Sequence, residues 1–228
     1  RNMTYNFTEK YDIILIGASG FVGSAILEEA LNRGHKVTAL VRNPEKIQVK
    51  NENLTVLAVD ATDVEALSKV AAGKDAVISA YNPGWGNPRL YEEILENYPK
   101  IIEGVKKAGV QRLLVVGGAG VLYVQPGVRL MDSGTLPAEL MPAVKGEGEL
   151  FLNVLSKEND IDWVYFAPPA NLGNMGKGIR TGKYRLGTDT LLVDEKGDSF
   201  ISVEDYAVAM IDELEQEAHH KALFTAAY

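Results

Sequence analysis

The sequence predicts an α/β fold in which a doubly wound, mainly parallel sheet carries helices on both faces. The first observation is an apolar run from Tyr11 to Ile16 that ends in a glycine-rich turn. The second is a helical period that begins at Ser24, with apolar residues recurring on one side. The third is the alternation of short apolar runs with helical segments along the rest of the chain, which is typical of parallel sheets with crossover helices.

The turn after the first strand carries three glycines, Gly17, Gly20 and Gly23, spaced G-x-x-G-x-x-G. Gly17 would let the chain turn, Gly20 would let the backbone approach a diphosphate, and Gly23 would let the helix pack closely on the strand. The helix N-terminus would offer free N–H groups and a partial positive charge to the phosphates. Because a strand precedes this turn and a helix follows it, the pattern favours a dinucleotide site over an ordinary tight turn.

Further strands and helices follow in alternation. Strands are predicted at residues 36–41, 54–59, 76–80, 112–116, 162–166, 184–186, 191–193 and 222–225, and helices at 62–72, 87–108, 137–156 and 202–214. Together they predict a single NAD(P)-binding domain of the Rossmann type over residues 11–228. Segments 121–136 and 169–200 are expected to build a small, mainly C-terminal substrate region. Residues 1–10 are polar and are expected to be a disordered tail or an expression remnant.

Composition narrows the class of protein. The 228 residues carry a formal net charge of −8 without a Lys/Arg cluster, so no nucleic-acid partner is expected. There are no cysteines, and the three histidines are not grouped, so no metal site is expected. No run of about 18 apolar residues could span a membrane, and the polar N-terminal residues do not form a secretory signal. A cytoplasmic protein without a membrane partner is therefore expected, and nothing in the sequence specifies its oligomeric state.

Basic and amide residues follow the second predicted strand. About 20 residues past the glycine turn, an NAD site places an acidic residue on the ribose 2′-hydroxyl, whereas an NADP site places a cation there. This chain has Arg42, Asn43 and Lys46 at that point. A solvated turn could carry the same residues, but their place after the strand favours NADP(H) over NAD(H). Asp60, which follows the third strand, would lie beside the adenine.

These motifs, together with Lys145 followed by Glu149, resemble those of atypical or extended short-chain dehydrogenases/reductases. The chain is similar to the branch that contains the nitrogen-repression-regulator (NmrA)-like proteins and the biliverdin IXβ or flavin reductases. That branch includes bacterial proteins provisionally named NADH-flavin reductases and NAD-dependent epimerases. The resemblance covers nearly the whole chain. It implies a Rossmann-type sheet with NADP along its carboxyl edge and a small-molecule substrate beside it.

The chain departs from this family at the usual acid and base. Catalytic members use Tyr-x-x-x-Lys, in which the tyrosine transfers the substrate proton and the lysine holds the nicotinamide ribose. Met141 stands four residues before Lys145, and a thioether cannot transfer a proton. The hydroxyl residue that commonly follows the fifth strand is also missing from the stretch Gly117–Ala119. Lys145 would still bind the ribose, or it would pair with Glu149 on an exposed helix face.

Three functions are compatible with this loss. The first is an NADP(H)-dependent reductase that transfers a hydride to a flat conjugated acceptor such as a flavin, with the balancing proton taken from water. The second is a non-catalytic dinucleotide sensor that binds a protein partner. The third is an NAD-dependent sugar-nucleotide epimerase or dehydratase, in which Tyr81, Tyr123 or Tyr184 would replace the missing tyrosine.

The predicted site has two parts. The catalytic residues are predicted to be Lys145 and Tyr123. The predicted cofactor contacts are Gly17, Ser19, Gly20, Phe21, Val22, Gly23, Arg42, Asn43, Lys46, Asp60, Ala61, Ala80, Tyr81, Asn82, Gly117, Gly118, Lys145 and Pro168.

Overall fold

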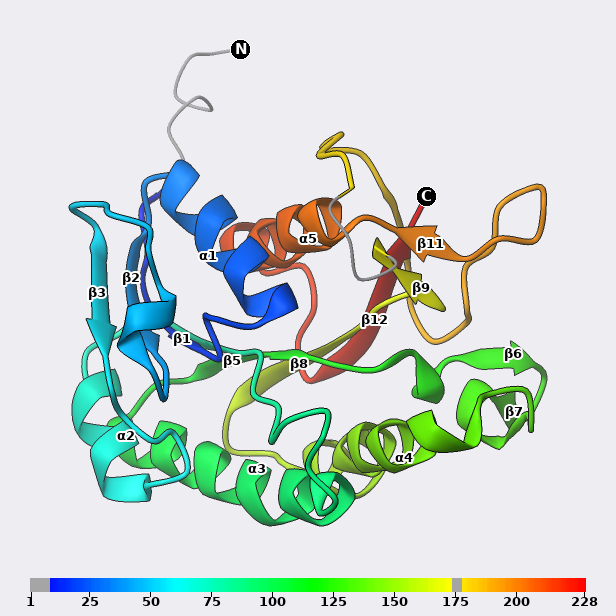
Figure 1. The fold of residues 1–228 in the computed structure, drawn as a ribbon, viewed down its shortest axis with the longest axis horizontal. Helices are drawn as coiled ribbons and strands as arrows, with labels where there is room; N and C mark the ends of the chain where they lie inside the picture. Colours follow the sequence, from blue (N-terminus) through cyan, green and yellow to red (C-terminus); the bar gives the residue numbers. More distant parts are fainter. Residues whose placement is uncertain (1–8, 174–177) are drawn as a thin grey trace.

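The computed structural model describes residues 9–173 and 178–228 and has the predicted architecture (Figure 1). In this part of the chain, eight strands form one sheet in the order β10-β12-β8-β5-β4-β1-β2-β3. Neighbouring strands are parallel except β10 with β12. The strands are β1 (Asp12–Ile16), β2 (Lys36–Leu40), β3 (Leu54–Leu57), β4 (Ala76–Ser79), β5 (Arg112–Val116), β8 (Asp162–Ala167), β10 (Arg185–Gly187) and β12 (Ala222–Ala227). The prediction of a doubly wound, mainly parallel sheet is confirmed.

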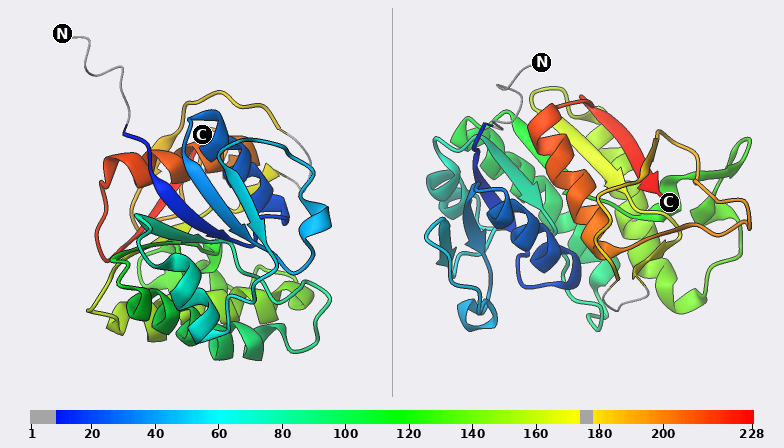
Figure 2. Two further views of the ribbon diagram at one scale, coloured as in Figure 1. Left: turned by 90° about the vertical axis from the view of Figure 1, so that its left-hand side faces the viewer. Right: turned by 90° about the horizontal axis from the view of Figure 1, so that it is seen from above.

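Helices cover both faces of this sheet, as Figure 2 shows. The helices are α1 (Phe21–Asn32), α2 (Val64–Ala71), α3 (Leu90–Ala108), α4 (Met141–Glu149) and α5 (Val203–Gln216). α1 and α5 pack side by side on one face, whereas α2, α3 and α4 cover the other. Successive side chains of β1 belong to different apolar clusters, Ile13 to that of α1 and α5 and Ile14 to that of α2 and α3. This alternation follows from the two-residue period of a strand, and it gives the sheet two buried faces.

The strand order places a switch point beside β1. The chain runs from β1 to β2 and β3 on one side and then crosses to β4 on the other. In such a sheet the crossover segments diverge at the carboxyl ends of the strands and leave a crevice there, where ligands bind. The turn after β1 and the segments after β2, β4 and β5 all begin at this edge.

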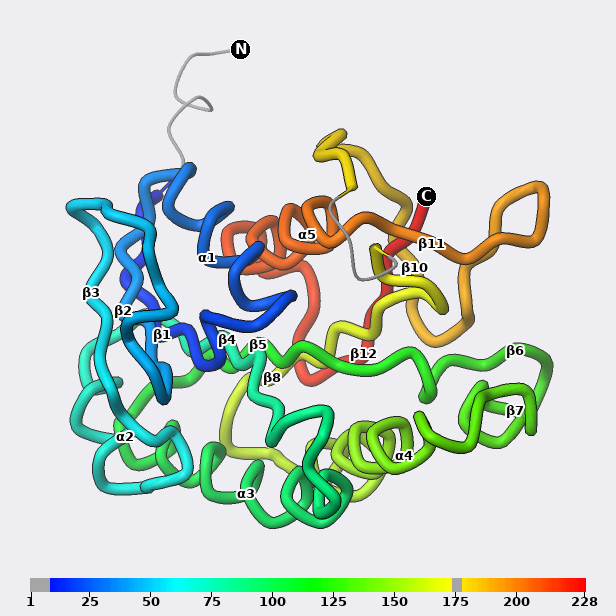
Figure 3. Tube along the Cα trace, viewed as in Figure 1, coloured from blue at the N-terminus to red at the C-terminus, as the bar shows by residue number. Residues whose placement is uncertain are grey.

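Two segments that lie largely outside the main sheet meet at one end of the molecule (Figure 3). The first forms a hairpin of β6 (Tyr123–Gln125) and β7 (Val128–Arg129), and the second contains the pair β9 (Asn171–Leu172) and β11 (Phe200–Ile201). The Tyr123 N–H donates to the Asp189 carbonyl oxygen at 2.8 Å, which joins the two segments. They correspond to the segments expected to build the substrate region.

The structure differs from the sequence prediction in detail. No strand forms at residues 191–193, where the Leu191 N–H donates to the Tyr123 carbonyl oxygen at 3.0 Å and pairing does not continue. The helix predicted at 137–156 is divided: α4 is followed by a π turn (Leu150–Val154) and a 3-10 turn (Leu155–Lys157). Most of the predicted tail, residues 1–8, lies outside the described residues. None of the described helices is long and apolar enough to cross a membrane.

Candidate functional site

The turn after β1 is shaped by glycines that have no room for a side chain. Gly17 has a φ of +77°, and a Cβ atom built on it would lie 2.5 Å from the carbonyl oxygen of Ala80, which follows β4. A Cβ on Gly23 would lie 1.9 Å from the Gly17 carbonyl oxygen. Gly20 differs, because the nearest atom to its Cβ position is 3.6 Å away. Gly17 and Gly23 are therefore required by packing, whereas a Cβ atom at Gly20 would meet the protein only at ordinary contact distance.

The N-terminus of α1 lies at this position. Gly20 is its N-cap residue, and among the residues that the structure describes no side chain accepts a hydrogen bond from the N–H groups of the first turn. Ser19 is exposed beside it, and Phe21 and Val22 begin the helix. Free N–H groups, the positive end of a helix and a bare glycine are the features that bind a diphosphate. The residues present therefore fit a dinucleotide, which they would hold by its phosphates.

Alanine substitutions should separate the two kinds of glycine. Gly23→Ala is expected to lower the free energy of unfolding by roughly 1–3 kcal/mol, because the new methyl group overlaps the Gly17 carbonyl. Gly20→Ala is the matched control for folding and should unfold like the wild type while binding NADPH at least about tenfold more weakly. Urea unfolding and fluorescence titration measure the two effects. Equal stability of the two variants would contradict this assignment of roles.

The segment after β2 carries a basic residue into the crevice. Arg42 Nη2 donates to the carbonyl oxygen of Asn82, in the segment after β4, at 3.4 Å. This contact reaches across the end of β1 and brings together two of the predicted cofactor contacts. Asn43 and Lys46 are exposed in the short 3-10 turn that follows. The Arg42 guanidinium thus lies at the carboxyl edge, between the segments after β2 and β4. A guanidinium can bind a phosphate in a bidentate manner.

Asp60 and Ala61 stand at the outer end of the same edge, after β3. The exposed Asp60 carboxylate accepts hydrogen bonds from the Thr62 N–H at 2.9 Å and the Thr62 hydroxyl at 2.7 Å. Ala61 is buried behind it. The two residues form a closed turn that would border the adenine.

The segments after β4, β5 and β8 form the other end of the crevice. Ala80, Tyr81 and Asn82 follow β4, while Gly117 and Gly118 follow β5. A Cβ on Gly117 would lie 2.2 Å from the ring of Tyr165, so a hydroxyl residue has no room there. Buried Pro168 follows β8, the next strand of the sheet. Since these strands are parallel neighbours, the predicted contacts meet at one edge.

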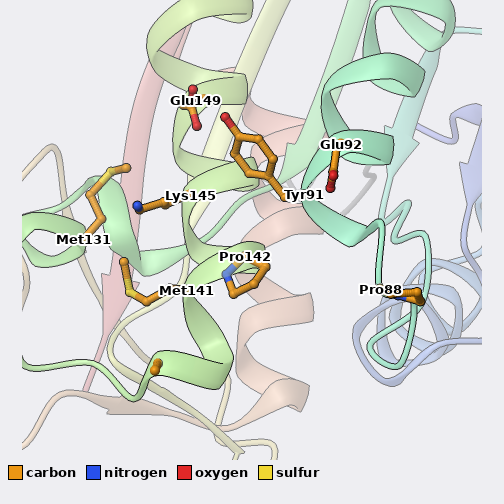
Figure 4. A pocket seen from close by; sticks show the side chains of 9 residues that line it. Pro88, Tyr91, Glu92, Met131, Met141, Pro142, Lys145 and Glu149 are labelled. Atoms are coloured by element: carbon orange, nitrogen blue, oxygen red, sulfur yellow. The ribbon is translucent and has the colours of Figure 1, made fainter.

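Lys145 lies apart from this edge. Its exposed side chain lines a groove between α3 and α4, where Figure 4 shows it near Met131. Residues two apart on a helix point to nearly opposite sides, so Lys145 faces away from the side of α4 that carries Glu147. The Glu147 carboxylate lies against Gly118 at the crevice. The spacing from Met141 to Lys145 therefore does not bring Lys145 to the glycine turn, and its ribose contact stays a prediction.

Tyr123 is also separate from Lys145. It lies in β6, where its hydroxyl accepts a hydrogen bond from Arg129 Nη2 at 3.0 Å and the Arg129 guanidinium sits 4.4 Å from its ring centroid. It lines a second groove, with residues 124–127, 189 and 190. The structure thus does not join the two predicted catalytic residues in one pocket.

Glu147 is the residue at the crevice that the sequence analysis missed. A Cβ built on Gly118 would lie 2.4 Å from its Oε2 atom. Burial raises the pKa of the Glu147 carboxyl to about 7. A signal existed in the sequence, because Ala143, Glu147 and Leu150 recur at helical spacing and Ala143 and Leu150 are apolar. Ala143 and Leu150 are buried, and Glu147, which lies between them on the same side of α4, is half-buried.

The first strand of this parallel sheet ends in a glycine turn at a helix N-terminus, and a basic residue follows the second strand. These features define a dinucleotide-binding protein of the Rossmann type. The model of the NAD(P)H-binding family matches residues 17–217. The chain belongs to this family, and its cofactor is a nicotinamide dinucleotide. The resemblance to atypical short-chain dehydrogenases/reductases is confirmed.

Similar proteins cover nearly the whole chain. Bacillus subtilis YwnB is 40% identical over 213 residues, which are 92% of this chain and 95% of YwnB. A Bacteroides thetaiotaomicron protein of known structure, provisionally named an epimerase, is 55% identical to this chain, with a TM-score of 0.89. The match covers 96% of this chain and 98% of the Bacteroides chain. A Streptococcus pneumoniae protein, provisionally named an NADH-flavin reductase, is 33% identical with a TM-score of 0.80, covering 95% and 99%.

Proposed function

We propose that the protein is an NADP(H)-dependent reductase of a flat conjugated acceptor such as a flavin. The observation that carries the proposal is the end of β5, where Gly117 packs against the Tyr165 ring and Gly118 follows. Epimerisation of a sugar needs a hydroxyl side chain here that acts as acid and base. A conjugated ring needs none, because it delocalises the negative charge that arrives with the hydride. Such a ring can also stack on backbone that carries no side chain. The Streptococcus pneumoniae relative bears a name of this kind.

The residues of the crevice would bind and orient the two reactants. The first turn of α1 would hold the diphosphate, and Arg42 would hold the 2′-phosphate of NADP(H). Ala80–Asn82 and Gly118 would border the nicotinamide and leave one of its faces open to the acceptor. Bound NADPH supplies the hydride, and the protein accelerates the transfer mainly by holding the two rings face to face.

An epimerase is the second candidate, because the Bacteroides thetaiotaomicron relative bears that name. It would need one of three tyrosines as its acid and base. The Tyr81 hydroxyl accepts a hydrogen bond from Asn97 at 2.6 Å, and that of Tyr123 is held by Arg129. The Tyr184 hydroxyl donates to Asp212 of α5. Within the described residues none of these hydroxyls is hydrogen-bonded to Lys145, the usual partner of the catalytic tyrosine, which favours the reductase over the epimerase.

One titration tests the proposal. NADPH and NADH are added separately to the protein, and FMN is then added while the absorbance of the reduced dinucleotide is followed. We expect tighter binding of NADPH, and oxidation of NADPH once FMN is present. Arg42→Asp should weaken NADPH binding at least about tenfold and NADH binding much less, because only NADPH carries the 2′-phosphate.

Lys50→Asp provides the matched control, because it changes the net charge equally at an exposed position in the loop after Arg42. It should bind NADPH like the wild type. If both variants weaken NADPH binding equally, Arg42 acts only through the net charge of the protein and does not contact the 2′-phosphate. Binding without oxidation, with FMN or another conjugated acceptor, would favour the dinucleotide sensor.

A further inference from the structure

We propose that Glu147 is the acid that protonates the reduced acceptor, in place of the tyrosine that the chain lacks. This proposal rests on the proposed reductase function. It replaces water, which the sequence analysis took as the proton source, with a side chain of the protein.

The first support is the position of the carboxyl. Glu147 lies on the face of α4 that is turned to the sheet, and its Oε2 atom stands 2.4 Å from where a Cβ of Gly118 would be. Gly118 follows β5 at the carboxyl edge, so the carboxyl reaches the end of the crevice that would hold the reacting rings. With any larger residue at 118, the carboxyl could not take this position.

The second support is the way this position is held. The Tyr165 hydroxyl accepts a hydrogen bond from the Gly118 N–H at 2.9 Å and donates one to the Glu147 carbonyl oxygen at 2.8 Å. Tyr165 lies in β8, so one side chain ties the turn after β5 to α4 and to the sheet. The backbone that carries the Glu147 side chain is therefore held in place. A group that transfers a proton in a defined direction needs such support.

The third support is the surroundings of the carboxyl. Within the described residues, no hydrogen-bond donor or cation pairs with it. The titratable groups near it on this face of the sheet are the hydroxyls of Tyr165 from β8 and Tyr98 from α3. Burial raises the pKa values of both phenols, and the charge of Glu147 raises them further. Phenols with raised pKa values are poor acids near neutral pH. Burial raises the pKa of the Glu147 carboxyl to about 7, where a general acid works best.

The proposed step balances in protons and electrons. The reduced dinucleotide gives two electrons and a proton to the acceptor as a hydride and is oxidised. The acceptor is reduced and gains negative charge on a heteroatom. The O–H bond of the Glu147 carboxyl breaks, a bond from that proton to the heteroatom forms, and the carboxylate then takes a proton from solvent for the next cycle.

The test begins with a readout that needs no turnover. The dissociation constants of NADP⁺ and NADPH are measured from about pH 6 to about pH 8.5, on either side of the expected titration. An ionised Glu147 would favour the positively charged oxidised ring, so the preference for NADP⁺ over NADPH should rise about tenfold across this range. Glu147→Gln should abolish the rise, and Glu149→Gln, in the groove between α3 and α4, should retain it.

Turnover is then measured with FMN. We expect Glu147→Gln to reduce the rate about 100-fold and to remove the fall in rate as pH rises through about 7, since a positioned acid contributes about 100-fold or more. If the preference for NADP⁺ does not depend on pH, or if Glu147→Gln reduces FMN as fast as the wild type, the role of Glu147 is overturned. The proposed reductase function is not affected by either result. Wild type that binds NADPH but reduces no conjugated acceptor would overturn the reductase, and the acid role with it.

Discussion

Replacing Arg112 by alanine is expected to lower the free energy of unfolding by about 3–5 kcal/mol, the usual cost of removing one partner of a buried ion pair. Arg112 is the first residue of β5, and its side chain is 8% exposed. Its Nη2 atom lies 2.6 Å from Oε2 of Glu213, which is 3% exposed in α5. Its Nη1 atom donates to Asp162 of β8 at 3.2 Å and to the His219 carbonyl oxygen at 2.9 Å. Alanine would remove all of these contacts.

Urea unfolding measures this loss, and two further variants make the cause identifiable. Arg89→Ala is the control. It removes an exposed ion pair, because the side chains of Arg89 and Glu96 are 53% and 52% exposed. It should cost less than about 1 kcal/mol. The double variant Arg112→Met, Glu213→Leu should recover much of the loss, since it leaves no buried charge. A loss in Arg112→Ala no larger than in Arg89→Ala would contradict the interpretation.

The same variant separates stability from binding. Arg112 and its partners lie at the amino end of the parallel strands, opposite the crevice. We therefore expect Arg112→Ala, under conditions in which it is folded, to bind NADPH with unchanged affinity. The ion pairs hold the sheet to α5 and take no part in the site.

Local sequence patterns were sufficient for most of the fold. The strand, turn and helix from Asp12 to Asn32 are determined by neighbouring residues, so apolar period and glycine spacing predict them. The false strand at 191–193 shows the limit. Leu191 bonds to Tyr123, which lies far away in sequence, and whether a short apolar run extends such a contact into a strand depends on that distant partner.

The parts of the candidate site that follow strand ends could be predicted from the sequence. The part that depends on the orientation of a helix could not be predicted. Gly17, Arg42 and Gly118 follow parallel strands, so their meeting at one edge follows from the topology. For α4, the prediction took the helix orientation from the family motif at Lys145. The structure turns Ala143, Glu147 and Leu150 to the sheet instead, because the apolar members of that stripe must be buried.

This orientation predicts a pH-dependent stability. The carboxyl of Glu147 has its pKa raised by burial to about 7, from an ordinary value of 4.5. Between these values the folded protein keeps a proton that the unfolded chain has lost, so stability falls as pH rises, and it levels off above the folded pKa. Each unit of pKa difference corresponds to about 1.4 kcal/mol.

Wild type should therefore lose roughly 2–3 kcal/mol more of its free energy of unfolding than Glu147→Gln between about pH 5 and about pH 8. Glutamine keeps the size of the side chain and carries no titrating proton, so at the upper pH the variant should be the more stable protein. Urea unfolding at several pH values measures the two slopes, with Glu149→Gln expected to follow the wild type. Parallel slopes for wild type and Glu147→Gln would mean that the carboxyl is solvated, and a solvated carboxylate would be ionised at neutral pH and unable to supply the proton.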